Sequence, residues 1–340
     1  MIENILDQSV KKLGHEISFI LGHKVLAKTA QDWVELKGET LSVSEWEDLK
    51  DLCLQSNEKV QLETKGYVAG VYQSNKYHWK FSFTEKKECF KAYLSLILPA
   101  EQLGSAIENP YFWDLIKKDK GLFIIAGERK QGKSTLLGEI MISDHKDKLR
   151  LTGLHAQLNQ QKWPQLDSVI HLGADTVDFD SQHSLYDGIE RVIVDFNQVK
   201  NWPKWIDFVE QGQSVLVTVS VDSITSLFQK LSSDLSKSVF QRLIQSLNGI
   251  VIQKFVGVEK VTAHEILILR NSEKEKLLTE FLEKESFYHI KLSELGTDSY
   301  QSLNQSLIQR LIRRKVDVKA AFAASNDPDQ LDSQLKKLGL

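Results

Sequence analysis

The feature that most constrains the fold is the stretch from Gly121 to Leu137, GLFIIAGERKQGKSTLL. It contains G-x-x-x-x-G-K-S from Gly127 to Ser134, the pattern of a loop whose backbone N–H groups close around phosphate oxygens. An apolar, strand-like run, Leu122–Ala126, precedes the loop, and a segment with helical apolar spacing follows it. A strand, a glycine-rich loop and a helix in this order predict an α/β domain with an anion site at the helix N-terminus.

Each residue type in this loop has a defined chemical role. The glycines let the backbone approach phosphate oxygens closely, and the following helix directs its positive end at them. A lysine at the position of Lys133 reaches the β- and γ-phosphates, and a hydroxyl at the position of Ser134 binds Mg²⁺. We therefore predict a nucleotide with Mg²⁺ as the ligand of this loop. The predicted nucleotide-binding residues are Gly127, Gln131, Gly132, Lys133, Ser134 and Thr135.

The composition is that of an ordinary globular protein, with 41% hydrophobic and 26% charged residues. Its 340 residues suffice for about two domains. The net charge of -3 gives no basic field for binding nucleic acid. No apolar run approaches the roughly 18 residues of a membrane span, and the N-terminus has no signal-peptide pattern. We therefore expect a cytoplasmic protein that meets a membrane only through partners.

The pattern of predicted secondary structure changes after Pro110. Before it, amphipathic helical patterns mix with short alternating strands such as Trp33–Gly38 and Tyr77–Phe83, which indicates a smaller α+β domain. After it, apolar strands alternate with helical stretches, the pattern of a parallel sheet covered by helices. The predicted division is an N-terminal domain (residues 1–103), a linker (residues 104–112), a nucleotide-binding α/β domain (residues 113–290) and a C-terminal helical region (residues 291–340).

Two further segments carry local structural signals. Ser42–Leu54, SVSEWEDLKDLCL, has helical spacing, with Ser44 as the predicted N-cap. Ile250–Leu269, IVIQKFVGVEKVTAHEILIL, is predicted to form two strands around a turn at Gly257. The helix falls in the predicted N-terminal domain, and the two strands fall in the predicted nucleotide-binding domain.

Three segments after the loop stand in a fixed order: Ser238–Phe255 (SVFQRLIQSLNGIVIQKF), Ala263–Ile268 (AHEILI) and Ser299–Leu331 (SYQSLNQSLIQRLIRRKVDVKAAFAASNDPDQL). Together with the loop, they resemble the PilT family of twitching-motility retraction ATPases, within the secretion-ATPase superfamily. The resemblance covers nearly the whole chain and weakens over residues 1–100. It implies an N-terminal PAS-like domain, a RecA-like P-loop domain and C-terminal helices.

The resemblance also implies an assembly and partners. Members of the family form homo-hexamers that work at the base of a type IV pilus. The partners so implied are further copies of this chain, an active pilus motor ATPase and an inner-membrane pilus platform protein. The resemblance implies no nucleic acid and no membrane span, so a place at the inner membrane would be peripheral.

One strand that ends in a catalytic acid in the family has a different ending in this sequence. The family has Gly-Glu there, and its Glu helps to activate water and to order Mg²⁺. The matching segment is RVIVDFNQ, in which Phe196 falls at the position of Glu and Asp195 at that of Gly. Asp195 is our candidate catalytic residue and, with Ser134, our candidate Mg²⁺ residue, because a carboxylate can bind Mg²⁺ through water. The alternative is a strand-end residue without a role, since a one-residue shift turns a side chain to the opposite face.

Three other catalytic features of the family are missing. The region of its acidic box, Leu151–Asn159, contains no carboxylate, and His155 within it is expected to be structural. Ser220 stands where the family has a His, and a serine cannot carry that charge. No arginine precedes Arg129, whereas the family uses N-terminal arginines to reach the γ-phosphate. The lysines that remain near the expected segment are Lys86, Lys87 and Lys91, which lack the planar fork of arginine.

Two motifs allow more than one interpretation. Within the loop, Glu128 brings negative charge near the phosphates, which Arg129 and Lys130 can offset, so it stays open whether the loop still closes around nucleotide. Downstream, AHEILIL lacks the second His of a zinc protease motif. By resemblance, His264 and Glu265 are expected to be structural.

These departures favour a degenerate PilT-like P-loop protein that binds nucleotide with weak or no ATP hydrolysis. It would have a regulatory or structural role in a type IV pilus or a related secretion or motility machine. The alternative is an active hexameric ATPase that powers pilus retraction with Asp195 in place of the usual Glu. A P-loop GTPase or kinase is a third reading, which the absence of an N-K-x-D motif disfavours.

Overall fold

The chain divides into two compact units, one before residue 103 and one after it. The predicted linker, residues 104–112, lies outside the described residues apart from Ile107 and Phe112. The computed structural model describes residues 2–12, 16–29, 32–74, 77–87, 89–97, 107, 112–113, 116–117, 120–147, 151–156, 168–171, 188–195, 201–284, 292–296 and 298–339.

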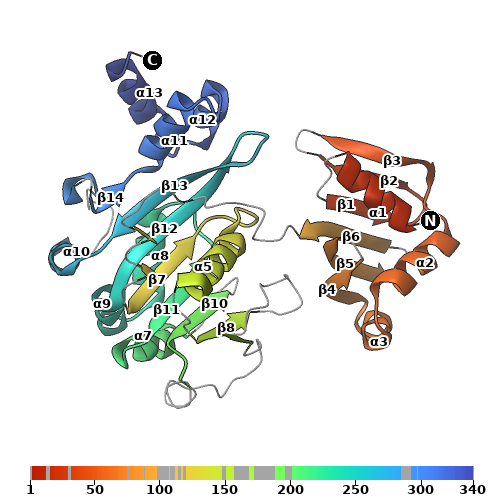
Figure 1. The fold of residues 1–340 in the computed structure, drawn as a ribbon, viewed down its shortest axis with the longest axis horizontal. Helices are drawn as coiled ribbons and strands as arrows, with labels where there is room; N and C mark the ends of the chain where they lie inside the picture. The colour runs from red at the N-terminus through yellow and green to blue at the C-terminus, as the bar shows by residue number, and fades with distance from the viewer. Residues whose placement is uncertain are drawn as a thin grey trace. The chain divides into compact units, whose positions relative to one another are not determined.

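The N-terminal unit is an antiparallel sheet with three helices. Its elements are α1 (Ile2–Lys11), β1 (Glu16–Ile20), β2 (Lys24–Lys28), β3 (Trp33–Thr40), α2 (Val43–Cys53), α3 (Ser56–Lys65), β4 (Tyr67–Gln73), β5 (His78–Lys86) and β6 (Cys89–Ile97). The strand order is β3-β2-β1-β6-β5-β4, so the first and last strands pair at its centre (Figure 1). Alternate residues of β5, Trp79, Phe81 and Phe83, are buried, as period-two spacing requires. This is the PAS-like α+β domain that the resemblance implied.

Helix α2 begins two residues earlier than predicted, because Ser42 and not Ser44 is its N-cap. The Ser42 hydroxyl accepts from the backbone N–H of Glu45, and the Glu45 carboxylate accepts from the backbone N–H of Ser42 at 3.0 Å. This reciprocal pair satisfies two N–H groups that a helix start leaves without partners. It also turns Trp46 and Leu49 into the core of the unit.

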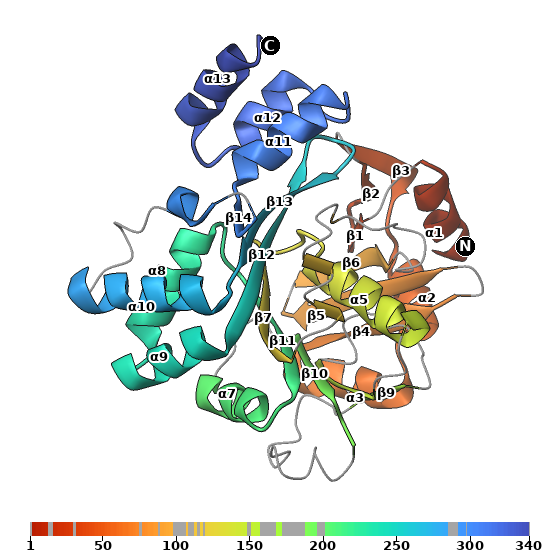
Figure 2. The same cartoon turned by 60° about the vertical axis from the view of Figure 1, so that its left-hand side comes forward.

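The second unit contains a mainly parallel sheet covered by helices. Its first elements are β7 (Gly121–Ala126), α5 (Lys133–Asp147), β8 (Thr152–Ala156), β9 (Val169–His171), β10 (Arg191–Asp195), α7 (Trp202–Glu210), β11 (Ser214–Val219), α8 (Ile224–Asp234), α9 (Lys237–Ser246), β12 (Leu247–Val256), β13 (Val261–Ile268) and α10 (Asn271–Lys284). Strands β12, β7, β11, β10, β8 and β9 are neighbours in this order and parallel. Helix α5 covers one face, and α7, α8 and α9 cover the other (Figure 2). Strands β12 and β13 form the predicted hairpin, with Gly257 in its turn.

The C-terminal region contains the predicted helices and, in addition, a short strand. It comprises a 3₁₀ turn, η4 (Leu292–Leu295), then β14 (Tyr300–Gln301), α11 (Leu303–Ile312), α12 (Val318–Ala324) and α13 (Pro328–Lys337). The short β14 pairs with β13 and extends the sheet. The three helices share a small core with Val256 of β12 and Ala263 of β13, so they are anchored on the hairpin. Within the part of the chain described, no helix has both the length and the hydropathy needed to cross a membrane.

A buried ion pair joins β10 to α5. Arg191, at the start of β10, is fully buried and contacts the carboxylate of Asp144 on α5. The same guanidinium donates to the carbonyl of Ile116 at 2.5 Å and to the hydroxyl of Ser214 at 3.2 Å. These bonds satisfy a charge that would otherwise be costly in the interior, and they fix α5 along the sheet.

Candidate functional site

The phosphate loop, residues 127–134, connects the carboxyl end of β7 to the start of α5 (Figure 1). Gly127 has φ +150° and Gly132 has φ +81°, both conformations that side chains rarely adopt. A Cβ at Gly127 would lie 2.5 Å from the carbonyl oxygen of Gln253, and one at Gly132 would lie 2.5 Å from Gln253 Nε2. The two glycines are therefore required by the backbone and by strand β12 behind the loop.

Lys133 is held inside the loop. Its Nζ donates to the carbonyl oxygens of Gly127 and Glu128, each at 2.8 Å. An ammonium group has three N–H donors, so this arrangement leaves one for a ligand. Burial lowers the pKa of Lys133 below its ordinary value; the charges of Asp195 and Glu128 oppose this effect, and that of Arg129 adds to it.

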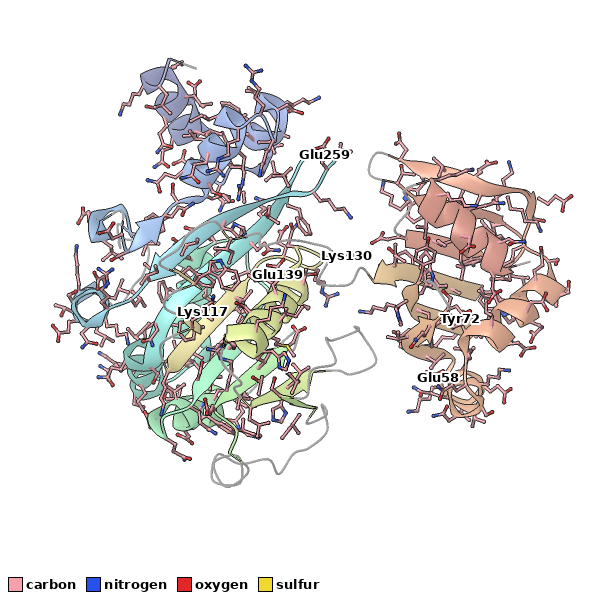
Figure 3. All side chains as sticks on the ribbon, in the orientation of Figure 1. Glu58, Tyr72, Lys117, Lys130, Glu139 and Glu259 are labelled. Atoms are coloured by element: carbon pink, nitrogen blue, oxygen red, sulfur yellow. The ribbon has the colours of Figure 1, made fainter. Side chains whose placement is uncertain are left out.

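The other predicted nucleotide-binding residues lie around this lysine. Ser134 and Thr135 are partly buried in the first turn of α5, where the helix N–H groups lack partners within the helix. Gln131 is partly buried, whereas Glu128, Arg129 and Lys130 are exposed. Lys130 is labelled on the loop in Figure 3. The charged residues that raised doubt about the loop thus lie on its solvent side.

Asp195 lies at the carboxyl end of β10, on the same edge of the sheet as the loop. Its Oδ1 accepts a hydrogen bond of 2.6 Å from the hydroxyl of Thr218 on β11. The charge of Asp195 also partly offsets the lowering of the Lys133 pKa by burial, so the two side chains are close enough to interact electrostatically. Sequence reasoning did not find Thr218, because its partnership with Asp195 depends on strand register. In the structure Val194 of β10 pairs with Val217 of β11, so the two residues that follow them lie side by side.

The chemistry of these groups fits a nucleotide with Mg²⁺. Glycines that admit no Cβ, a lysine with one donor to spare and the N-terminus of α5 together form a cradle for phosphate oxygens. Among the described residues, no group of three or more His, Cys, Asp and Glu is placed to hold a metal ion. Ser134 and Asp195 carry the oxygen groups that would contact Mg²⁺ or its water in this cradle.

The positions that depart from the family pattern are only partly described. Ser220 follows β11 directly and is partly buried at the carboxyl edge of the sheet. Phe196 and residues 157–159 lie outside the described residues. His155 is buried in β8 and its ring packs edge-on against Trp205 of α7, with 5.4 Å between centroids, which supports a structural role. The exposed side chains of Lys86, Lys87 and Lys91 surround the β5–β6 turn.

Glu265 is a structural residue, as expected. Its carboxylate is buried and accepts from the backbone N–H of Ile224, the first residue of α8, at 3.0 Å. It also accepts from the hydroxyl of Tyr300 at 2.8 Å. Burial raises the pKa of Glu265 above its ordinary value. The side chain thus joins β13 to the start of α8 and to β14.

Comparison with known proteins establishes the fold. No family model matches the sequence, and no curated protein matches it. Among solved structures, the ATPase DotB of Legionella pneumophila aligns with a TM-score of 0.74 and 15% identity over 94% of each chain. The pilus retraction motor PilT with bound ADP aligns with a TM-score of 0.75 and 17% identity over 97% of this chain and 98% of PilT. DotB of Yersinia pseudotuberculosis gives 0.75 and 16% over 95% and 92%.

At these identities the likeness is one of fold. The predicted α/β fold class, a RecA-like domain with a smaller N-terminal domain, is confirmed. The resemblance to PilT-like secretion ATPases is confirmed at this level of fold, at low sequence identity.

Proposed function

We propose that this chain binds ATP with Mg²⁺ at the phosphate loop and hydrolyses it weakly or not at all. The observation that carries the proposal is the arrangement of the loop, in which two glycines that admit no Cβ frame a lysine with one donor to spare. The likeness to PilT, whose solved structure holds ADP, supports a nucleotide as the ligand.

Binding would use groups that are already in position. Backbone N–H groups of the loop and of the first turn of α5 would donate to the phosphate oxygens. Lys133 would add its remaining N–H, and the hydroxyl of Ser134 would bind the metal. When bound, Mg²⁺ neutralises part of the charge on the β- and γ-phosphates. Thr218 would hold the carboxylate of Asp195 in one orientation toward that metal through the 2.6 Å hydrogen bond.

Hydrolysis needs more than this site supplies. Serine at position 220 cannot act as a cation, and β8 carries no carboxylate. No arginine stands in the N-terminal third of the sequence to stabilise the transferring phosphate, a contribution of about 10³–10⁵ in rate in other P-loop enzymes. Asp195, at the carboxyl end of β10, is then our candidate for any remaining water activation.

The cellular role follows from the likeness to a pilus retraction motor and is part of the same proposal. The chain would form a homo-hexamer in the cytoplasm, peripheral to the inner membrane. It would act as a regulatory or structural partner of an active pilus motor ATPase or of the platform protein, in a type IV pilus or a related secretion machine.

Equilibrium titration with ATP tests the binding proposal. We expect Lys133→Ala to weaken ATP binding by about 10- to 100-fold, since it removes a charged hydrogen bond. Lys130→Asn is the matched control, because Lys130 is exposed on the same loop and its φ of 65° suits asparagine. A parallel titration with GTP tests the alternative that the chain is a P-loop GTPase. Equal ATP affinity in the wild type and in Lys133→Ala would refute the proposal.

The second candidate is an active hexameric ATPase that powers pilus retraction. The specific observation in its favour is that Asp195 lies at the carboxyl end of β10, on the same edge of the sheet as the loop that holds Lys133. This candidate predicts ATP turnover that Asp195→Asn abolishes while ATP affinity changes little. Wild-type protein without turnover, even with pilus components added, would eliminate it.

A further inference from the structure

Strand β12 holds the phosphate loop through a reciprocal pair of hydrogen bonds. The side chain of Gln253 donates from Nε2 to the carbonyl oxygen of Gln131 at 2.6 Å. The side chain of Gln131 in turn accepts at Oε1 from the backbone N–H of Phe255 at 2.5 Å. We call these two hydrogen bonds, formed by Gln131, Gln253 and Phe255, the loop clamp.

The same part of β12 also shapes both ends of the loop. The carbonyl of Gln253 closes the space beside Gly127, and its Nε2 together with the Phe255 ring closes the space beside Gly132, at 2.5 Å and 2.8 Å from a Cβ built there. Gln253 is 3% exposed, and its Oε1 has no hydrogen-bond partner in the described part of the chain. Burying a polar side chain with one atom unpaired costs free energy. The hydrogen bond that Gln253 donates to the loop explains its position better than packing does.

Strand β12 is itself a rigid support. It pairs with β7 on one side and with β13 on the other, and Val256 at its end lies in the core of the C-terminal helices. A loop bonded to such a strand loses little further conformational freedom when a ligand arrives. A loop that is open part of the time binds its ligand more weakly, in proportion to the fraction that is closed.

We propose that Gln131 and Gln253 are positioning residues that keep the phosphate loop closed before nucleotide binds and thereby set its affinity for ATP. This inference rests on the proposed function, because it concerns the same site. It assigns a role to Gln253, which carries no part of the P-loop pattern, and a specific role to Gln131 as the loop's attachment to β12.

The test compares Gln253→Met and Gln131→Met with Gln213→Met. Methionine keeps the side-chain length and removes the hydrogen-bonding groups. Gln213 is the matched control, since it is also buried and also donates to a backbone carbonyl, that of Ile189 at 2.8 Å. It precedes β11 and so lies at the opposite end of the parallel strands from the loop. Each full-length protein is examined without nucleotide by hydrogen exchange of the loop peptide and is then titrated with ATP.

We expect Gln253→Met and Gln131→Met each to speed exchange in the loop peptide and to weaken ATP binding by about 2- to 12-fold, the range for one hydrogen bond. Gln213→Met should lower the melting temperature with loop exchange and ATP affinity unchanged. Wild-type loop exchange in both clamp variants, or an equal loss of affinity in the control, would overturn the inference. If the wild type binds no ATP, the proposed function fails, whereas loop exchange still decides whether the clamp holds the loop.

Discussion

Gly132 is the loop residue with the least room for change. Its φ of +81° is a left-handed conformation, and a Cβ would meet Gln253 and Phe255 at 2.5 Å and 2.8 Å. We expect Gly132→Ala to cost about 1–3 kcal/mol of stability through overpacking and to weaken ATP binding. Thermal melting and ATP titration measure the two effects.

The control for this variant is Gly22→Ala. Gly22 has a similar φ of +77°, but nothing lies within 4 Å of its Cβ position, so only backbone strain is added. ATP binding should be unaffected. Unchanged ATP affinity in Gly132→Ala would show that the loop is not confined in the way we describe.

Glu45 gives the N-terminal unit a defined response to acid. The hydrogen bond from Lys37 at 2.6 Å, with that from the Ser42 backbone, lowers the pKa of Glu45 from 4.5 to about 2. Because the folded-state pKa is depressed, the stabilisation is present above pH 4.5 and is lost as pH falls from 4.5 toward about 2. Glu45→Gln should therefore melt below the wild type near neutral pH and approach it in acid.

Melting curves across this pH range check the Glu45 prediction. Glu47→Gln, on the exposed side of the same helix, should change melting little. A gap between Glu45→Gln and the wild type that stays constant down to pH 2 would show that another group is responsible.

At the scale of elements, the buried pair of Arg191 and Asp144 fixes α5 against β10. Asp144→Asn leaves a buried guanidinium without its counter-charge, so we expect a loss of about 3–5 kcal/mol in the free energy of unfolding. The double variant Asp144→Leu with Arg191→Met should lose less than the sum of its single variants, because no buried charge remains. Urea denaturation of the wild type, Asp144→Leu, Arg191→Met and the double variant measures the coupling, and strict additivity would contradict it.

Local patterns were sufficient to predict the elements around the phosphate loop and the β12–β13 hairpin. The strand before the loop, the helix after it and the β12–β13 hairpin follow from runs of apolar residues and glycine turns in the chain itself. The start of α2 could not be decided this way. Ser42 and Ser44 are each followed three residues later by a glutamate, so both satisfy the capping pattern. The structure uses Ser42, and the residues of α2 that pack into the core are Trp46, Leu49 and Cys53.

Contacts between distant segments could not be predicted. The partnership of Thr218 with Asp195 depends on the register of two strands, and that of Gln253 with Gln131 joins residues more than a hundred positions apart. The two residues of β14 carry too little pattern to be recognised as a strand, and they join the sheet only because β13 lies beside them.

At the scale of the whole molecule, the proposed homo-hexamer can be tested directly. Light scattering should give a mass near that of a hexamer of a 38.8 kDa chain. Because the sequence has no arginine before Arg129 to reach a neighbour's nucleotide, we expect this mass to depend little on ATP. A monomer both with and without ATP would refute the ring.

The central claim is our proposal that the loop still binds ATP while hydrolysis is weak or absent. The most direct test measures ATP binding and phosphate release on one preparation, with Lys133→Ala beside it. We predict ATP binding that Lys133→Ala weakens, together with phosphate release no faster than that of the Lys133→Ala protein. Phosphate release well above that of Lys133→Ala would contradict the account and identify the chain as an active ATPase.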